Sequence, residues 1–246
     1  MNTVIECVAL RTVRYSDRNS ILTAYSRQYG PVSLLVPAGN GRQASRMRAL
    51  MMPLGHFECV ADIRPGREIY PVHDLRPLSL PSAGDPLRAS LSLFIADVLT
   101  GLLREQSPDE HLFNFLVDML SMMRIGTDAP VLTVRQLCNL HVWFLVRMSH
   151  YLGIEPDWHT YTPGSVLDMQ DGIFRHFPPA HRNFLPPDES AAANRLSRMT
   201  PRNLGRYRFS RFERNTALDR ILRYYHIHFP TFSEPSSLAV LRLMAD

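Results

Sequence analysis

The stretch from Ser20 to Val36, SILTAYSRQYGPVSLLV, contains two short apolar segments separated by a turn. Gly30-Pro31 lies between the segments and Pro37 ends the second, so both are too short for helices and are typical of strands. Further segments of this kind flank the pair and complete the expected strands: residues 3–10, 20–26, 31–36, 56–62 and 67–72. Five short strands with no helical period between them predict a closed antiparallel barrel. We favour an OB-fold, although periodicity alone does not distinguish it from an SH3-like barrel.

From Asp85 onward the apolar residues recur at helical spacing. Asp85-Pro86 and two capping boxes, Ser107–Glu110 and Ser210–Glu213, mark the starts of three helices. A further helix is expected over residues 132–152 and a short one over 237–245. The helix that begins after Ser210 should extend to about His228. Its expected inward-facing residues are Phe212, Ile221, Leu222 and Tyr225.

The expected architecture is therefore α+β and multidomain. A five-stranded OB-fold β-barrel, residues 1–80, should be followed by a mainly α-helical C-terminal domain, residues 81–246. Within the second domain, residues 154–188 form an irregular insert that is rich in proline, glycine and aromatic residues. Hydrophobic residues make up 45% and charged residues 20% of the 246 positions, which is typical of globular chains.

The basic residues are unevenly distributed. All 27 are arginine, and nine of them lie between residues 195 and 225 against only Glu213 and Asp219. Residues 1–80 are also basic, whereas residues 81–194 are acidic. Two basic regions around an acidic one favour a polyanionic partner, although solvated helix faces also carry charge runs.

Two groups of arginines are the candidate DNA contacts. The loop from Ala38 to Arg48 combines paired glycines with three arginines, which suits contact with phosphates, although a merely solvated loop has the same composition. The expected contacts of the barrel are Arg14, Arg18, Arg27, Arg42, Arg46 and Arg48. Those of the second basic region are Arg202, Arg206, Arg208 and Arg211.

Sequence motifs for catalysis and for membrane insertion are absent. There is no P-loop, GxGxxG, HExxH or GxSxG motif, and Cys7, Cys59 and Cys138 form no CxxC pair. We expect a cytoplasmic chain, because no apolar run is long enough for a membrane span and the N-terminus lacks the features of a signal peptide. A metal site remains an alternative, since the histidine-rich segment 150–181 contains possible ligands: His150, His159, His176 and His181, with Asp157 or Asp171.

Several short motifs follow one another along the chain. Tyr15-Ser16-Asp17-Arg18-Asn19-Ser20-Ile21-Leu22-Thr23 is followed by Tyr29-Gly30, the glycine-arginine loop and Met51-Met52-Pro53-Leu54. Four further motifs come later in the chain: Leu75-Arg76-Pro77-Leu78, the segment 135–153 with its terminal Leu152-Gly153, the segment 211–229, and Ser236-Ser237-Leu238-Ala239-Val240-Leu241. In order and spacing this set resembles the RecO family of bacterial recombination mediators over nearly the whole chain.

The resemblance implies a non-enzymatic protein of DNA repair. Members combine an OB-fold with a helical domain, bind single- and double-stranded DNA, anneal complementary strands and associate with the nucleoid. They contact the C-terminal tail of single-strand binding protein and, with RecR, help to load RecA on gapped DNA. Many members hold zinc with four cysteines after the motif that corresponds to Leu152-Gly153. Residues 154–187 contain no cysteine, so the resemblance implies neither a metal nor a cofactor here.

The resemblance also implies a pocket on the helical domain for the acidic tail of single-strand binding protein. A terminal phenylalanine and carboxylate need an apolar slot beside an arginine. We expect Arg135 to hold the carboxylate and Arg124 to supply a second charge, with Leu132, Gln136 and Asn139 on or beside the same face. Two alternatives stay open: a metal-dependent hydrolase that uses residues 150–181, and a pure protein-interaction scaffold.

Overall fold

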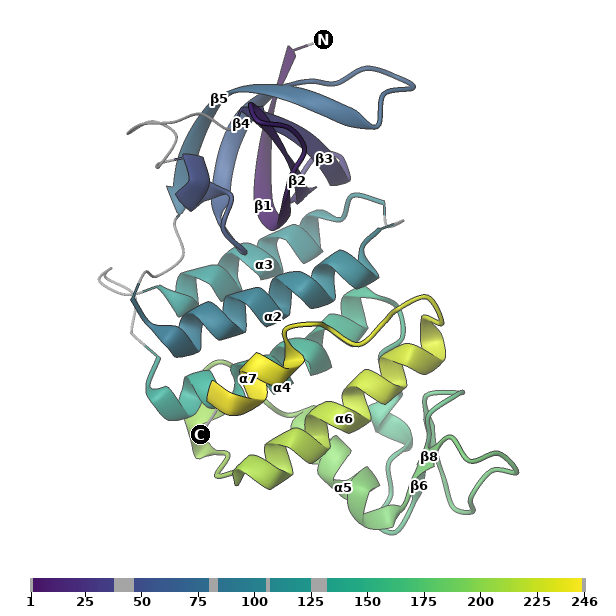
Figure 1. Cartoon of the computed structure of the whole chain (residues 1–246). Helices are drawn as coiled ribbons and strands as arrows, with labels where there is room; N and C mark the ends of the chain where they lie inside the picture. Colours follow the sequence, from purple (N-terminus) through teal and green to yellow (C-terminus); the bar gives the residue numbers. More distant parts are fainter. Residues whose placement is uncertain (1, 38–46, 80–83, 105–106, 125–131, 245–246) are drawn as a thin grey trace. The chain divides into compact units, whose positions relative to one another are not determined.

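The computed structural model describes residues 2–37, 47–79, 84–104, 107–124 and 132–244 (Figure 1). Packing divides the chain into two compact units. The barrel unit consists of residues 1–131 and 235–244. The second unit consists chiefly of residues 132–234 and is called the α4–α6 unit after its helices α4 (Val134–Tyr151) and α6 (Arg211–His228). Three helices therefore belong to the barrel unit, and the expected domain boundary near residue 80 stays a prediction.

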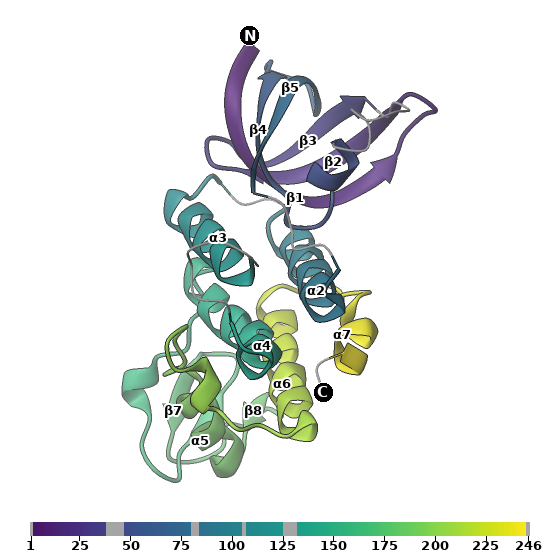
Figure 2. The same cartoon turned by 90° about the vertical axis from the view of Figure 1, so that its left-hand side faces the viewer.

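The barrel is closed and has five strands. These are β1 (Asn2–Arg14), β2 (Asn19–Ser26), β3 (Gly30–Pro37), β4 (His56–Asp62) and β5 (Ile69–Ser79). Their order around the barrel is β1-β2-β3-β5-β4 (Figure 2), and only β3 and β5 run parallel. The five expected strands and the OB-like barrel are confirmed.

Strand β1 pairs with both β2 and β4, which closes the barrel. Its register with β2 shifts between Ala9 and Arg11, a bulge of the kind that bends barrel strands. Along β2 and β3 the side chains alternate between buried and half-buried, so Leu22 and Leu34 point into the core with Ile5 and Phe57. This period of two is what the sequence pattern predicts.

The helices of the barrel unit are α2 (Pro86–Leu102), α3 (Glu110–Met123) and the short α7 (Leu238–Met244). Asp85 caps α2 as expected. The capping box expected at Ser107–Glu110 is wrong, because α3 is capped by Asp109. The Asp109 carboxylate accepts from the backbone N–H groups of His111 and Leu112, so the helix begins two residues later than Ser107 would allow.

The α4–α6 unit contains the two longest helices, α4 (Val134–Tyr151) and α6 (Arg211–His228), which pack against each other (Figures 1 and 2). The expected capping box Ser210–Glu213 opens α6, and the helix ends at His228 as predicted. Phe212, however, is 79% exposed, so its expected inward orientation is wrong. Phe212 lies on the first turn of α6, whereas the buried face of the helix is formed farther along by Leu218, Leu222 and Tyr225.

Between α4 and α6 the chain forms small elements. They are the 3-10 helices η1 (Trp158–Thr160) and η2 (Leu204–Arg206), strands β6 (Val166–Asp168), β7 (Ile173–Arg175) and β8 (Phe184–Leu185), and helix α5 (Pro187–Leu196). The short strands agree with the expected insert, whereas α5 was not predicted. Its signals are present, since Pro187 opens it and Asp188 and Glu189 occupy its first turn. Among the described residues no helix is long and apolar enough to span a membrane.

Candidate nucleic-acid interface

Three of the expected DNA contacts of the barrel are exposed. Arg14 and Arg18 flank the turn between β1 and β2, and Arg48 lies on the helical turn 47–50. The Arg14 guanidinium is 2.7 Å from the Asp17 carboxylate, but both side chains are so exposed that this pair holds Arg14 weakly. Arg42 and Arg46 lie outside the described residues. The structure thus leaves arginine side chains accessible at the β1–β2 turn and near residue 48.

Arg27 has a different environment from the other candidate arginines. Its guanidinium pairs with Glu6 at 2.6 Å, donates to Asn114 Oδ1 at 2.7 Å, and lies 4.5 Å from the centre of the Phe113 ring. The Glu6 hydrogen bond raises the pKa of Arg27. Arg27 therefore joins the β2–β3 turn to α3 within the barrel unit, and we leave it out of the DNA contacts proposed below.

Glu6 is the acceptor at the centre of this network. Its second oxygen lies 2.8 Å from His56 Nε2. Burial acts to raise the pKa of Glu6, but hydrogen bonds from Arg27 and His56 outweigh it and hold that pKa below its usual range. The carboxylate is thus ionised at neutral pH, and it stabilises the contact between β1 and the β2–β3 turn.

The second basic region contains the exposed residues Arg202, Arg206, Arg208 and Arg211. Asn139 of α4 fixes the backbone beside them: its Nδ2 donates to the carbonyl oxygens of Leu204 and Tyr207, both at 2.9 Å. Because Asn139 is only 1% exposed and its amide is engaged in this way, it anchors the arginine segment. It was expected beside Arg135 on the peptide-binding face.

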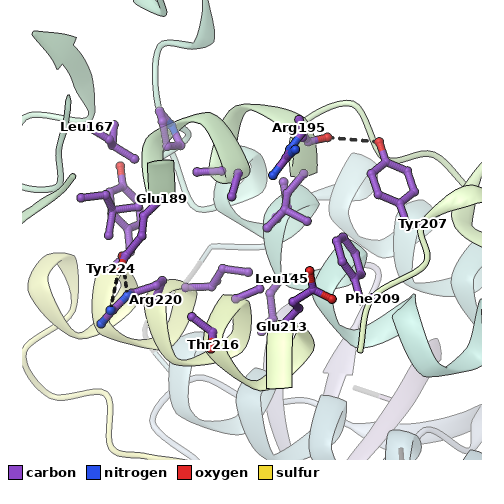
Figure 3. A pocket seen from close by; sticks show the side chains of 18 of the residues that line it. Leu145, Leu167, Glu189, Arg195, Tyr207, Phe209, Glu213, Thr216, Arg220 and Tyr224 are labelled. Carbon is purple, nitrogen blue, oxygen red and sulfur yellow. Dashed lines mark hydrogen bonds and ion pairs between the residues drawn. The ribbon is translucent and has the colours of Figure 1, made fainter. Parts of the chain in front are cut away.

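A groove lies beside this segment, between α4, α5 and α6 (Figure 3). Its volume is about 470 Å³, and aliphatic side chains such as Leu145 and Ile221 form much of its lining. Arg195 and Tyr207 lie at one end, joined by a 3.1 Å hydrogen bond from the Tyr207 hydroxyl to the Arg195 carbonyl. Glu189, Arg220 and Tyr224 lie at the other end.

The acidic residues of the groove have partners. Arg220 Nε lies 2.6 Å from Glu189 Oε2. Glu213 accepts from the backbone N–H and the hydroxyl of Ser210, and these bonds hold the pKa of Glu213 below its usual range. Arg206 and Arg208, in contrast, form no side-chain ion pair within the described part of the chain. The positive charges of Arg206 and Arg208 are therefore not neutralised by the acidic residues that line the groove.

Residues that the sequence analysis missed also line the groove: Arg195, Tyr207, Phe209 and Phe212. The signal for three of them was the alternation Arg206-Tyr207-Arg208-Phe209 with Phe212 close behind. Arginines interleaved with aromatic rings are typical of surfaces that bind nucleic acid. Arg195 belongs to the expected basic region but was not predicted as a contact, because helix α5, which carries it, was not expected.

The expected peptide-binding residues are divided between the two units. Arg124 ends α3 in the barrel unit, whereas Arg135, Leu132, Gln136 and Asn139 belong to the α4–α6 unit. Arg135 is exposed on the first turn of α4, and Leu132 is buried. Gln136 closes a capping box with Thr133, so its amide oxygen is already engaged by the helix start.

The histidines of the insert form polar contacts with carboxylates of the same region. His150 Nδ1 lies 2.7 Å from Glu155, and His181 Nε2 lies 3.3 Å from Asp168, which also accepts from Arg175. Within residues 150–181, all of which are described, no three histidine, cysteine, aspartate or glutamate side chains lie in a group that could hold a metal ion.

Comparisons with known proteins cover almost the whole chain. The family model Recombination protein O N terminal matches residues 1–80, and Recombination protein O C terminal matches residues 83–237. A protein of Porphyromonas gingivalis named DNA repair protein RecO is 33% identical over 254 aligned residues, which cover 99% of each chain. A protein of the same name from Phocaeicola vulgatus is 32% identical, covering 96% of this chain and 95% of its own.

Proposed function

The chain belongs to the RecO family, and on that premise we propose that it is a DNA-binding recombination mediator of DNA repair that makes and breaks no covalent bond. The observation that carries the proposal is the pair of exposed arginine groups. Arg14, Arg18 and Arg48 lie on the barrel unit. Arg202, Arg206 and Arg208 belong to the second basic region, and the latter two line the groove. Exposed guanidinium groups with free donors suit phosphates, which supply most of the affinity of proteins for DNA.

The proposed DNA contacts are Arg14, Arg18 and Arg48 on the barrel unit, with Arg42 and Arg46, which lie outside the described residues. Arg202, Arg206, Arg208 and Arg211 form a second group. Tyr15 and Tyr29 are exposed on the barrel unit and offer ring faces to bases. In this proposal the protein binds single- and double-stranded DNA and anneals complementary strands. It acts in the cytoplasm, associated with the nucleoid.

The partners follow from the family alone. We propose that the chain binds the tail of single-strand binding protein through Arg135, and that with RecR it helps to load RecA. Arg135 supports the first partner because its guanidinium is exposed on the first turn of α4 and is therefore accessible to a carboxylate.

The salt dependence of DNA binding tests the proposal. For single strands, log K falls with log salt by roughly 0.7 for each phosphate that is neutralised. The double variant Arg18→Ala with Arg48→Ala should therefore flatten the slope by about 1.4. Arg182→Ala is the matched control, because Arg182 is also exposed but belongs to neither arginine group.

Two results would contradict the proposal. Failure of the wild-type protein to bind DNA at low salt would favour the scaffold alternative, in which the arginines serve solubility. A folded double variant with the wild-type slope would show that the barrel arginines do not contact phosphates. Circular dichroism of each variant establishes that it is folded.

A further inference from the structure

The segment from Arg206 to Phe212 alternates arginine and aromatic side chains, RYRFSRF. In the first four residues of the segment the two kinds differ in exposure: Arg206 and Arg208 are exposed, whereas Tyr207 and Phe209 are half-buried against the groove. Their rings are neighbours, with centres 5.5 Å apart and planes inclined by 38°. Phe212 is the second residue of α6 and is 79% exposed. The segment thus combines the exposed arginines Arg206 and Arg208 with three aromatic rings.

Much of the lining of the groove is aliphatic or aromatic, and its three tyrosine hydroxyls already form hydrogen bonds within the protein. The Tyr224 hydroxyl donates to the carbonyl of Ile154 at 2.7 Å, and the Tyr225 hydroxyl donates to the carbonyl of Leu145. The Tyr207 hydroxyl is bonded to Arg195 (Figure 3). A ligand in the groove therefore gains most of its binding free energy from ring stacking and apolar contact. Such contact is indifferent to base sequence, because every base has a ring face.

The charge at the groove selects a ligand with anions beside its rings. Glu189 is neutralised by Arg220, and Glu213 is held by Ser210 at the start of α6. Arg206 and Arg208 lack ion-pair partners within the described residues, and they alternate along the chain with the rings. Single-stranded nucleic acid has the matching alternation of phosphate and base. In a duplex, the bases are stacked and paired with one another, so their faces are not available to protein rings.

We propose that the segment Arg206–Phe212 and its groove bind single-stranded DNA, with unpaired bases stacked on Phe212 and on the ring pair Tyr207–Phe209. Arg206 and Arg208 contact the flanking phosphates. The inference rests on the proposed DNA-binding function and adds a base-stacking site that prefers single strands. It also gives a physical reason for holding strands open before annealing, because stacked bases remain unpaired.

The test substitutes the exposed ring. Phe212→Ala removes a side chain that is 79% exposed, so folding should be unaffected. Loss of one base stack should weaken binding of an oligothymidylate by roughly tenfold and binding of a duplex hairpin by less than about twofold. Phe212→Trp should retain the affinity. Phe177→Ala is the matched control, since Phe177 is 82% exposed and does not line the groove.

A second readout reports stacking directly. The fluorescence of 2-aminopurine placed within the oligothymidylate should change on binding to the wild-type protein, and this change should be smaller with Phe212→Ala. Arg206→Gln with Arg208→Gln should lower the salt slope by about 1.4, since two phosphate contacts are lost. These variants separate the roles of the rings and the cations.

The outcomes distinguish this inference from the proposed function. If the wild-type protein binds no DNA, the proposed function fails. If it binds DNA but Phe212→Ala has wild-type affinity for single strands, or loses single-strand and duplex affinity equally, only the stacking site is overturned. The site is also overturned if Phe212→Ala loses affinity for the acidic tail peptide of single-strand binding protein but not for DNA, because the groove then serves a peptide.

Discussion

Asn139 of α4 and Tyr207 are joined by a hydrogen bond of 2.9 Å from the Asn139 side-chain amide to the Tyr207 carbonyl oxygen. The same amide holds the carbonyl of Leu204 at 2.9 Å. These bonds connect the N-terminal half of α4 to the backbone that presents Arg206 and Arg208. The geometry of the proposed DNA surface therefore depends on a residue that no solvent reaches.

Asn139→Ala should lower the free energy of unfolding by about 2 kcal/mol, because two hydrogen bonds are lost and two carbonyl groups are left without their partner. Urea unfolding measures this change. DNA affinity should fall as well, since the segment that carries Arg206 and Arg208 loses its anchor. Gln170→Ala is the control, because the Gln170 side chain is exposed. Full stability of Asn139→Ala would show that the segment is held by other contacts.

Arg27→Ala should reduce the free energy of unfolding by about 2 kcal/mol, because a charge-assisted hydrogen bond to Glu6 and the contact with the Phe113 ring are lost. The salt slope of DNA binding should remain that of the wild type. Urea unfolding and a salt titration on the same preparation measure both. A flatter salt slope for Arg27→Ala would show that Arg27 does contact a DNA phosphate.

The contribution of Glu6 to stability should depend on pH. The folded protein holds the pKa of Glu6 below its usual value of 4.5, so the ionised carboxylate stabilises the fold at neutral pH. This stabilisation is lost as the pH falls below 4.5 and through the lowered pKa. Unfolding measured from pH 7 to pH 3 should therefore show a shallower acid loss for Glu6→Gln than for the wild type. Parallel curves would show that Glu6 has the same pKa in both states.

Asp168→Asn should destabilise the α4–α6 unit by about 2 kcal/mol. Asp168 is 1% exposed, and its carboxylate accepts from the backbone N–H groups of Gln170 and Asp171 and from Arg175. Burial acts to raise the pKa of Asp168, but these bonds outweigh it and lower that pKa. Asp171→Asn is the matched control, since Asp171 also pairs with Arg175 but is exposed, so its loss should cost less than about 1 kcal/mol.

Arg135→Ala should weaken binding of the tail peptide of single-strand binding protein by about tenfold, the cost of one charge-assisted contact to a carboxylate. Fluorescence anisotropy at low salt measures the affinity. Arg147→Ala is the control: Arg147 lies on the same helix but about 18 Å farther along it, too far to share one carboxylate with Arg135. Equal affinities of the wild type and Arg135→Ala would show that Arg135 does not bind the carboxylate of the peptide.

Features that depend on residues near in the chain could be predicted from the sequence. The β2 and β3 strands follow from alternation and from the turn at Gly30-Pro31, and α6 begins at the capping box Ser210–Glu213 and ends at His228 as expected. Each rests on hydrogen bonds or periodicity within a few residues. Helix α5 was missed although Pro187, Asp188 and Glu189 signal its start, because the surrounding prolines suggested an irregular insert.

The amino-acid sequence by itself determined the five-strand barrel, the long helices, the two basic regions and the family resemblance. Only the tertiary structure decided what the individual polar side chains do. Arg27 and Arg206 are both arginines of basic regions, yet Arg27 binds Glu6 inside the barrel unit and Arg206 is exposed beside a groove. The residues that fix these two environments, Glu6 for Arg27 and Asn139 for the segment of Arg206, lie far away in the chain. Propensity and spacing act over a few residues and therefore carry no information about them.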